Sequence, residues 1–280
     1  MQSLILGLGA ALLWGVHDFT IRKISGSAQT SVLLVIVLAI GTLVLAPFAG
    51  LAAGWQDITP STLALSLMSG ACYGLACYAH YRAFAIGPVS LVAPICGAYP
   101  MVSVAFAVAR GQETNAMIWL GAFAVVAGVA VVARGKGAAG ERASLAAIGW
   151  ALLAATAFAA TFGLAQWAAE AGAELPVSLL ARCGALISVL VFVVLRRPPF
   201  HSALRLWPYL ALMAVLDVGA LVLITLAAGY ANPEVAPVVA SIFGLVTILL
   251  AWRLLNETMT VPQWLGVGTV FGGIVLLGLA

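Results

Sequence analysis

Runs of about 20 apolar residues recur along the whole chain, and this feature restricts the fold more than any other. A helix of that length crosses a bilayer core of roughly 30 Å. Only 8% of the 280 residues are charged, whereas an ordinary soluble domain has about 25%. No stretch between the runs is long or polar enough for a separate soluble domain. The sequence therefore predicts an all-α integral membrane protein.

Breaks at Gly, Pro and charged residues divide the apolar sequence into ten predicted transmembrane helices. Barrel strands of about ten alternating residues would not give such continuous runs. The first segment lacks a basic region and a cleavage site, so we expect it to remain as a span. The predicted spans are 3–21, 31–50, 62–85, 88–109, 115–133, 145–168, 175–195, 206–229, 235–255 and 262–279.

Prolines mark two of these spans as irregular. Pro88, Pro94 and Pro100 are expected to divide the fourth span, and Pro233 and Pro237 to open the ninth. Each proline lacks a backbone N–H and frees a carbonyl for bending or for contact with a solute.

Lys and Arg residues are distributed unequally between the two sides that ten spans define. Only Arg110 follows an even-numbered span, whereas nine basic residues lie in or beside the loops after odd-numbered spans. Because cytoplasmic loops carry the excess of basic residues, both termini are predicted on the periplasmic side of a bacterial inner membrane. The nine residues are Arg22, Lys23, Arg134, Lys136, Arg142, Arg196, Arg197, Arg205 and Arg253.

Three short sequences occur twice, in the same order. GAALL at 9–13 matches GWALL at 149–153, VAP at 92–94 matches VAP at 235–237, and ETNAMIWLG at 113–121 matches ETMTVPQWLG at 257–266. They predict two five-helix repeats, over 1–137 and 138–280. Because five is odd, equivalent helices cross the membrane in opposite directions, which places Glu113 outside and Glu257 in the cytoplasm. Such inverted repeats are typical of secondary transporters.

The two repeats resemble the drug/metabolite transporter superfamily, specifically its ten-helix EamA-type members. Arg182 is similar to an arginine that the family often carries in helix two or seven, whereas Gly244 replaces an expected proline and the second span lacks an arginine. The resemblance implies transport of amino acids, drugs or metabolites through a cavity lined chiefly by helices three, four, eight and nine. It is carried by AIGPVSLVAP at 85–94, Pro100, Glu113, Gly121 and Gly128, and by VAP at 235–237, Glu257, Gly266 and Gly273.

The third predicted span is unusually polar and aromatic, with GACYGLACYAHYRAF at 70–84. Helical spacing places most of its polar and aromatic side chains on one face, with Tyr78 beside that face. Hydroxyls and an imidazole are costly against lipid, so this face should point into protein or water. Aromatic rings there would suit an apolar, aromatic or cationic solute. The predicted substrate-binding residues are Trp14, Tyr73, Cys77, Tyr78, His80, Tyr81, Tyr99 and Trp167.

Asp217 and Arg182 are the charges predicted to lie deepest in the membrane. Two interpretations stay open: they pair structurally, or Asp217 binds a coupling proton or a cationic group. Near the cytoplasmic side, His17, Asp18 and Arg82 are predicted to form an inner gate. Alternatively, an i,i+4 pair with Arg22 neutralises Asp18 without a role in transport.

The predicted function is a secondary transporter that exports amino acids or similar neutral or cationic amphipathic compounds by alternating access. Protons are the first candidate for a coupling ion, and passive transport is the alternative. Phosphorylated substrates are disfavoured because the spans offer only Arg82 and Arg182 as cations. The alternative solutes are drugs, sugars or polyamines. The alternative direction is uptake.

Two other classes of function compete with transport. A membrane-embedded enzyme would need a nucleophile with a base or a metal motif such as HExxH, and only His17, Asp18 and His80 offer a small acid/base or metal cluster. A non-transporting scaffold is the third class. The expected partners are the bilayer and a small molecule, with no cofactor, metal or nucleic acid, and the protein acts as a monomer or homodimer. The four cysteines lie in apolar runs without CxxC spacing, so no disulfide framework is predicted.

Overall fold

The computed structural model describes residues 1–109, 115–134, 144–169, 174–227, 230 and 235–279, and the regular elements in these ranges are all helices. Six of the described helices are long and apolar enough to cross a membrane. A helix satisfies its backbone hydrogen bonds within one segment, which lipid requires. The six are α1 (Gln2–Ile24), α2 (Thr30–Gly50), α3 (Pro60–Ile86), α7 (Leu145–Ala169), α8 (Glu174–Arg196) and α10 (Trp207–Ala227).

Shorter helices occupy the other apolar segments. The fourth and ninth predicted spans are each divided into two helices, and the fifth and tenth are α6 and α13. Two short elements, η1 (Trp55–Asp57) and α9 (His201–Leu204), lie in connections. The shorter helices are α4 (Val89–Gly97), α5 (Tyr99–Ala109), α6 (Ala116–Arg134), α11 (Val235–Ala240), α12 (Phe243–Leu254) and α13 (Val261–Leu279).

The two divided segments break for different reasons. Between α4 and α5, Pro100 supplies no N–H, and the amide of Met101 binds the carbonyl of Ala98 at 3.0 Å. This confirms the predicted division of the fourth span, although Pro94 lies inside α4. Between α11 and α12 no proline stands at the break, where the amide of Leu245 binds the carbonyl of Ile242 at 2.9 Å. Pro233, one of the two prolines expected to open the ninth span, lies outside the described residues.

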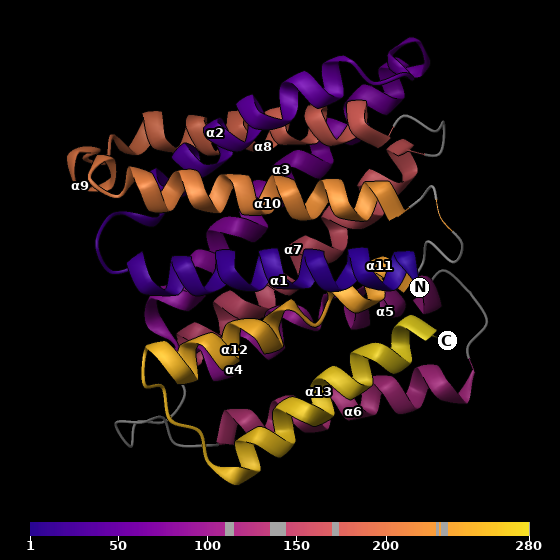
Figure 1. Ribbon diagram of the computed structural model, residues 1–280, viewed down its shortest axis with the longest axis vertical. Helices are drawn as coiled ribbons and strands as arrows, with labels where there is room; N and C mark the ends of the chain where they lie inside the picture. Colours follow the sequence, from indigo (N-terminus) through magenta and orange to yellow (C-terminus); the bar gives the residue numbers. More distant parts are fainter. Residues whose placement is uncertain (110–114, 135–143, 170–173, 228–229, 231–234, 280) are drawn as a thin grey trace.

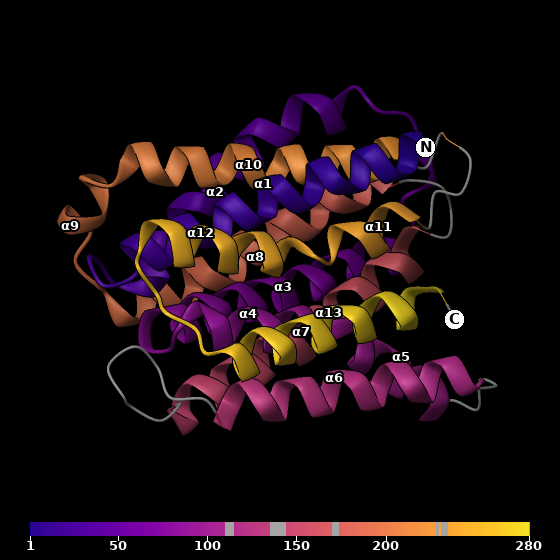
Figure 2. The same cartoon turned by 60° about the horizontal axis from the view of Figure 1, so that its bottom comes forward.

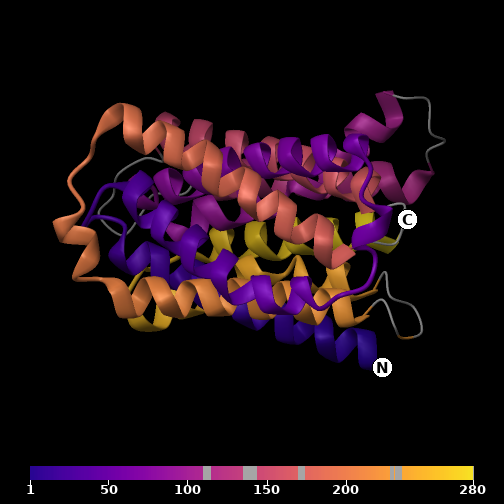
Figure 3. The same cartoon turned by 90° about the horizontal axis from the view of Figure 1, so that it is seen from above.

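The helices form one elongated bundle with both termini at the same end (Figure 1). We call this the termini end, and the opposite end, where α9 joins α8 to α10, the α9 end (Figure 3). Helix α1 packs on α10, α11 and α12, and α3 packs on α7 and α8. In the predicted repeat, α1 corresponds to α7 and α3 to α10. The contact between α1 and α10 therefore has its counterpart in the contact between α7 and α3. The chain directions of α1 and α7 are opposite (Figure 1).

A glycine seam joins α6 to α13, which lie side by side at one edge of the bundle (Figure 2). A Cβ on Gly121 would come within 2.9 Å of the carbonyl oxygen of Gly273, and one on Gly266 within 3.0 Å of that of Gly128. Gly121 and Gly128 precede Gly266 and Gly273 by 145 positions each, so the two contacts are equivalent under the repeat. The boundary predicted at 137 and 138, and Glu113, lie outside the described residues.

Candidate functional site

A central cavity of about 190 Å³ lies among α1, α3, α7, α8 and α10. It extends toward the termini end, since Ala165 near the end of α7 and Ser178 near the start of α8 line it. Polar groups from α1, α3, α8 and α10 share this cavity with a wall of rings. The aromatic lining residues are Trp14, Tyr73, Tyr81, Tyr99, Phe158, Phe162 and Phe243.

Asp217 and Arg182 form a buried ion pair on one side of the central cavity. Two further groups donate to the Asp217 carboxylate: the indole Nε1 of Trp14 at 3.0 Å and the hydroxyl of Tyr73 at 3.3 Å. Gly41 on α2 makes room for the guanidinium, because a Cβ there would lie 2.6 Å from Nη1 of Arg182. Three donors from three helices, α1, α3 and α8, therefore surround this carboxylate and compensate for its burial away from water.

A second carboxylate, Asp18, lies on another side of the cavity and is 3% exposed. Its oxygens lie 3.1 Å from Nδ1 of His17 and 3.0 Å from Nε2 of His80. The hydroxyl of Tyr81 lies 3.2 Å from the other ring nitrogen of His17. Because an ionised carboxylate only accepts, both imidazoles present an N–H to Asp18, and Tyr81 donates to His17 when that ring is neutral. The result is a continuous chain from Tyr81 through His17 and Asp18 to His80.

Arg22 does not pair with Asp18, so the local i,i+4 neutralisation is wrong. Its Nε atom lies 2.8 Å from Oε1 of Glu257, and its Nη1 donates to the carbonyl of Phe84 at 2.7 Å. The other oxygen of Glu257 accepts the amide of Val89, the first residue of α4, at 2.9 Å. This cluster joins the ends of α1 and α3 to the start of α4 and to the loop before α13. We call it the α9-end latch.

Most of the predicted site residues come together, and three do not line the central cavity. Tyr78 and Arg82 face a different hollow at the α9 end, because each is turned away from the face of α3 that carries Tyr73 and Cys77. Trp167 lies near the end of α7 and is 47% exposed. The other predicted residues, which are Trp14, His17, Asp18, Tyr73, Cys77, His80, Tyr81, Tyr99, Arg182 and Asp217, all line the cavity.

Sequence reasoning expected Trp167 to represent α7 in the pocket and missed Phe158 and Phe162 of the same helix. Phe158 lies 5.7 Å from the His80 ring and 6.2 Å from the Tyr73 ring, between ring centroids, and Phe162 lies 4.9 Å from Tyr99. The i,i+4 spacing of the two phenylalanines in FAATF was the available signal for one helix face. It was weak because an apolar ring on a transmembrane helix also suits lipid.

Among the described residues, no group of three or more His, Cys, Asp and Glu side chains could hold a metal ion. His17, Asp18 and His80 do meet, but as a hydrogen-bonded chain around one carboxylate. The cavity thus combines separated positive and negative groups with aromatic rings.

The sequence pattern of the EamA-like transporter family matches this chain twice, over residues 1–134 and 145–279. Comparison with curated proteins found no match. Among solved structures, one crystal structure of a protein matches with a TM-score of 0.62 at 15% sequence identity, covering 98% of this chain and 95% of the other. At this identity the likeness establishes the fold alone.

Proposed function

Because the chain belongs to the EamA-like transporter family, whose members move small solutes across membranes, we propose that it exports amino acids or similar amphipathic compounds. The observation that supports this proposal most is the chemistry of the central cavity. It places a guanidinium and two carboxylates between walls of aromatic rings. An amino acid offers the complementary groups: a carboxylate for the guanidinium, an ammonium for a carboxylate, and an apolar or aromatic side chain for the rings.

The size of the cavity favours a small solute. Its volume of about 190 Å³ is below the range of about 300 to 1,000 Å³ that is common for drug-sized ligands. Arg182 lines the cavity, so its guanidinium charge would attract the carboxylate of a solute. Asp18 and the rings of Tyr73 and Phe158 would attract an ammonium group.

The proposed topology has ten spans in two inverted repeats, 1–137 and 138–280, in the inner membrane of a bacterium. Arg22, Lys23, Arg196 and Arg205 lie at the α9 end of the bundle, which therefore faces the cytoplasm. The termini, and the end toward which the central cavity extends, then lie on the periplasmic side. In this conformation the α9-end latch closes the cytoplasmic side, and export requires the latch to open during alternating access.

Protons are the proposed coupling ion, and Asp18 is a better candidate for their binding site than Asp217. The guanidinium that holds Asp217 does not titrate in proteins, so protonation of that carboxylate would leave a buried charge unpaired. The partners of Asp18 are two imidazoles, whose ring nitrogens can each donate or accept a hydrogen bond, so a proton at this cluster can be shared among three side chains. Asp18, His17 and His80 are therefore proposed to act as the proton-binding inner gate.

The proposal is tested with purified protein in liposomes loaded with a mixture of unlabelled amino acids. Exchange for external labelled amino acids, each tested singly, should be saturable and should fall at least tenfold in Asp18→Asn at equal protein content. Asp57→Asn is the matched control, because this exposed aspartate lies in η1, outside the cavity. Absence of exchange for every amino acid, with exchange of an organic cation or sugar instead, would replace the proposed substrate class.

A further inference from the structure

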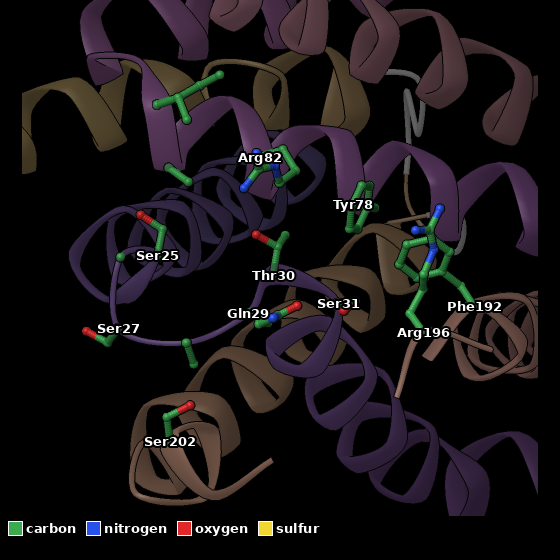
Figure 4. A pocket seen from close by; sticks show the side chains of 14 residues that line it. Ser25, Ser27, Gln29, Thr30, Ser31, Tyr78, Arg82, Phe192, Arg196 and Ser202 are labelled. Carbon is green, nitrogen blue, oxygen red and sulfur yellow. The ribbon is translucent and has the colours of Figure 1, made fainter. Parts of the chain in front are cut away.

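A second hollow of about 830 Å³ lies at the α9 end (Figure 4), and different residues of α3 line it and the central cavity. The loop between α1 and α2, the first turn of α2, the last turns of α3 and α8, and α9 surround it. On α3, Tyr73 and Cys77 face the central cavity, whereas Tyr78 and Arg82 face this hollow. We call it the α9-end crevice. The transport proposal assigns it no role.

Two arginines give the crevice an unopposed positive charge. Arg82 and Arg196 line it, and neither has an ion pair or hydrogen bond with any described residue. The described residues that line it include no aspartate or glutamate. The described carboxylates lie elsewhere: Asp18 and Asp217 at the central cavity, Glu257 in the latch, and Asp57 and Glu174 toward the termini end. An anion with several acceptor oxygens would offset these guanidinium charges.

Neutral donors in the crevice are buried and unused. The side chains of Thr30 and Ser31 belong to residues that are only 7% and 4% exposed, and neither hydroxyl has a partner among the described residues. Thr30 and Arg82 point toward one another in Figure 4. The first amides of α2 to bond within the chain are those of Val32 and Leu33, which both bind the carbonyl of Gln29. The preceding amides at the positive end of this 21-residue helix are therefore free for an anion.

The crevice also has an apolar side. The rings of Tyr78 and Phe192 lie 5.6 Å apart between centroids, one helical turn before Arg82 and Arg196 respectively. Arg196 lies over the Phe192 ring at 5.7 Å. Basic pockets between transmembrane helices at the cytoplasmic side are typical binding sites for anionic lipid head groups.

We propose that the α9-end crevice binds a phosphate group, carried by the head group of an anionic lipid or by a free phosphate. Arg82 and Arg196 supply the charge, and Thr30 and Ser31 supply hydroxyl and amide donors. The proposal does not depend on the identity of the transported solute, because the crevice and the central cavity lie on different faces of α3.

The test uses the full chain in a neutral detergent at constant ionic strength. Thermal shifts are measured during titration with inorganic phosphate, with short-chain phosphatidylglycerol, and with short-chain phosphatidylcholine as the uncharged-headgroup control. Binding to the native state raises the midpoint by mass action, so the concentration dependence gives an apparent Kd. Arg82→Gln and Arg196→Gln should each weaken binding about tenfold, since a hydrogen bond to a charged group is lost in each. Arg205→Gln removes the same charge at the same end outside the crevice, and should leave the Kd unchanged.

The two arms separate the two sources of phosphate. Tight binding of phosphatidylglycerol with weak binding of phosphate supports a lipid site, and comparable binding of both supports a free phosphate. If an arginine variant fails to fold, Thr30→Val tests the same site without a change of charge and should weaken binding about threefold to tenfold. The proposal is overturned if neither probe gives a saturable shift, or if Arg205→Gln weakens binding as much as Arg82→Gln does.

Discussion

Arg22 and Glu257 form an ion pair that closes the bundle one turn below Asp18, although 235 positions separate them in the chain. Both side chains also bind backbone groups, at the end of α3 and the start of α4. Opening the bundle at the α9 end would therefore break a charge-assisted contact and two helix caps together. In the proposed alternating access, the latch favours the conformation seen here.

Replacing Glu257 with Gln should favour the conformation that is open at the α9 end. A loss of about 1 kcal/mol from the latch would raise the population of that conformation about fivefold. In a variant with Cys77 as its only cysteine, labelling by an impermeant maleimide from the α9 side should speed up by this factor. Glu174→Gln, at the exposed start of α8, is the matched control. Equal labelling rates in both variants would show that the pair has no part in closure.

Removing either partner of the Arg182–Asp217 pair should destabilise the protein by roughly 3–5 kcal/mol, because the remaining charge stays buried. The double variant with Arg182→Gln and Asp217→Asn should recover much of this loss. Midpoints of thermal unfolding for the four proteins complete a double-mutant cycle. Additive losses would mean that the two residues act independently, and a structural pairing would then be excluded.

The pH dependence of transport should follow Asp18 and not Asp217. Asp18 faces His17 and His80, and Tyr81 faces His17, so loss of the carboxylate removes the group that links the two imidazoles. Exchange measured over a range of pH should depend on pH much less in Asp18→Asn than in the native protein. For Asp217→Asn, exchange normalised to the amount of folded protein should keep the pH dependence of the native protein. The reverse result would assign proton binding to Asp217.

Gly128→Ala should force α6 and α13 apart, because the added Cβ would lie 2.6 Å from the carbonyl oxygen of Gly266. Overpacking of this kind costs about 1–3 kcal/mol, and thermal unfolding of the purified protein measures it. Gly272→Ala is the control, since nothing lies within 4 Å of a Cβ at that exposed position of α13. If both variants unfold at the same temperature, the seam is not a tight contact.

The apolar runs predicted the positions of the helices well, because helix formation in lipid depends on local composition. The irregular segment at Ser241 and Ile242 was not predicted, since no proline marks it. There Gly244 approaches α4, with a Cβ on it reaching 3.3 Å from the carbonyl of Ala93, so the local shape depends on a distant helix. Six described helices are long and apolar enough to cross a membrane, and the total of ten spans stays a prediction.

Helical periodicity predicted which residues of α3 share a face, and most of the expected side chains do line one cavity. It could not predict the partners of charges. Asp18 and Arg22 are one turn apart, yet Asp18 binds His80 of α3 and Arg22 binds Glu257 in the loop before α13. Depth along a span can be read from a sequence, but the rotation of each helix toward its neighbours is set by packing.

The glycine seam relates two repeats whose cavity linings differ. By the match of GAALL to GWALL, the position in α7 equivalent to Asp18 in α1 is Phe158, 140 residues later. The two repeats thus bring a carboxylate from α1 and a phenyl ring from α7 to the same cavity at equivalent positions. An asymmetric lining of this kind can make the affinity for a solute differ between the two conformations of a transport cycle. The direction of net transport is then set by the gradients of solute and coupling ion.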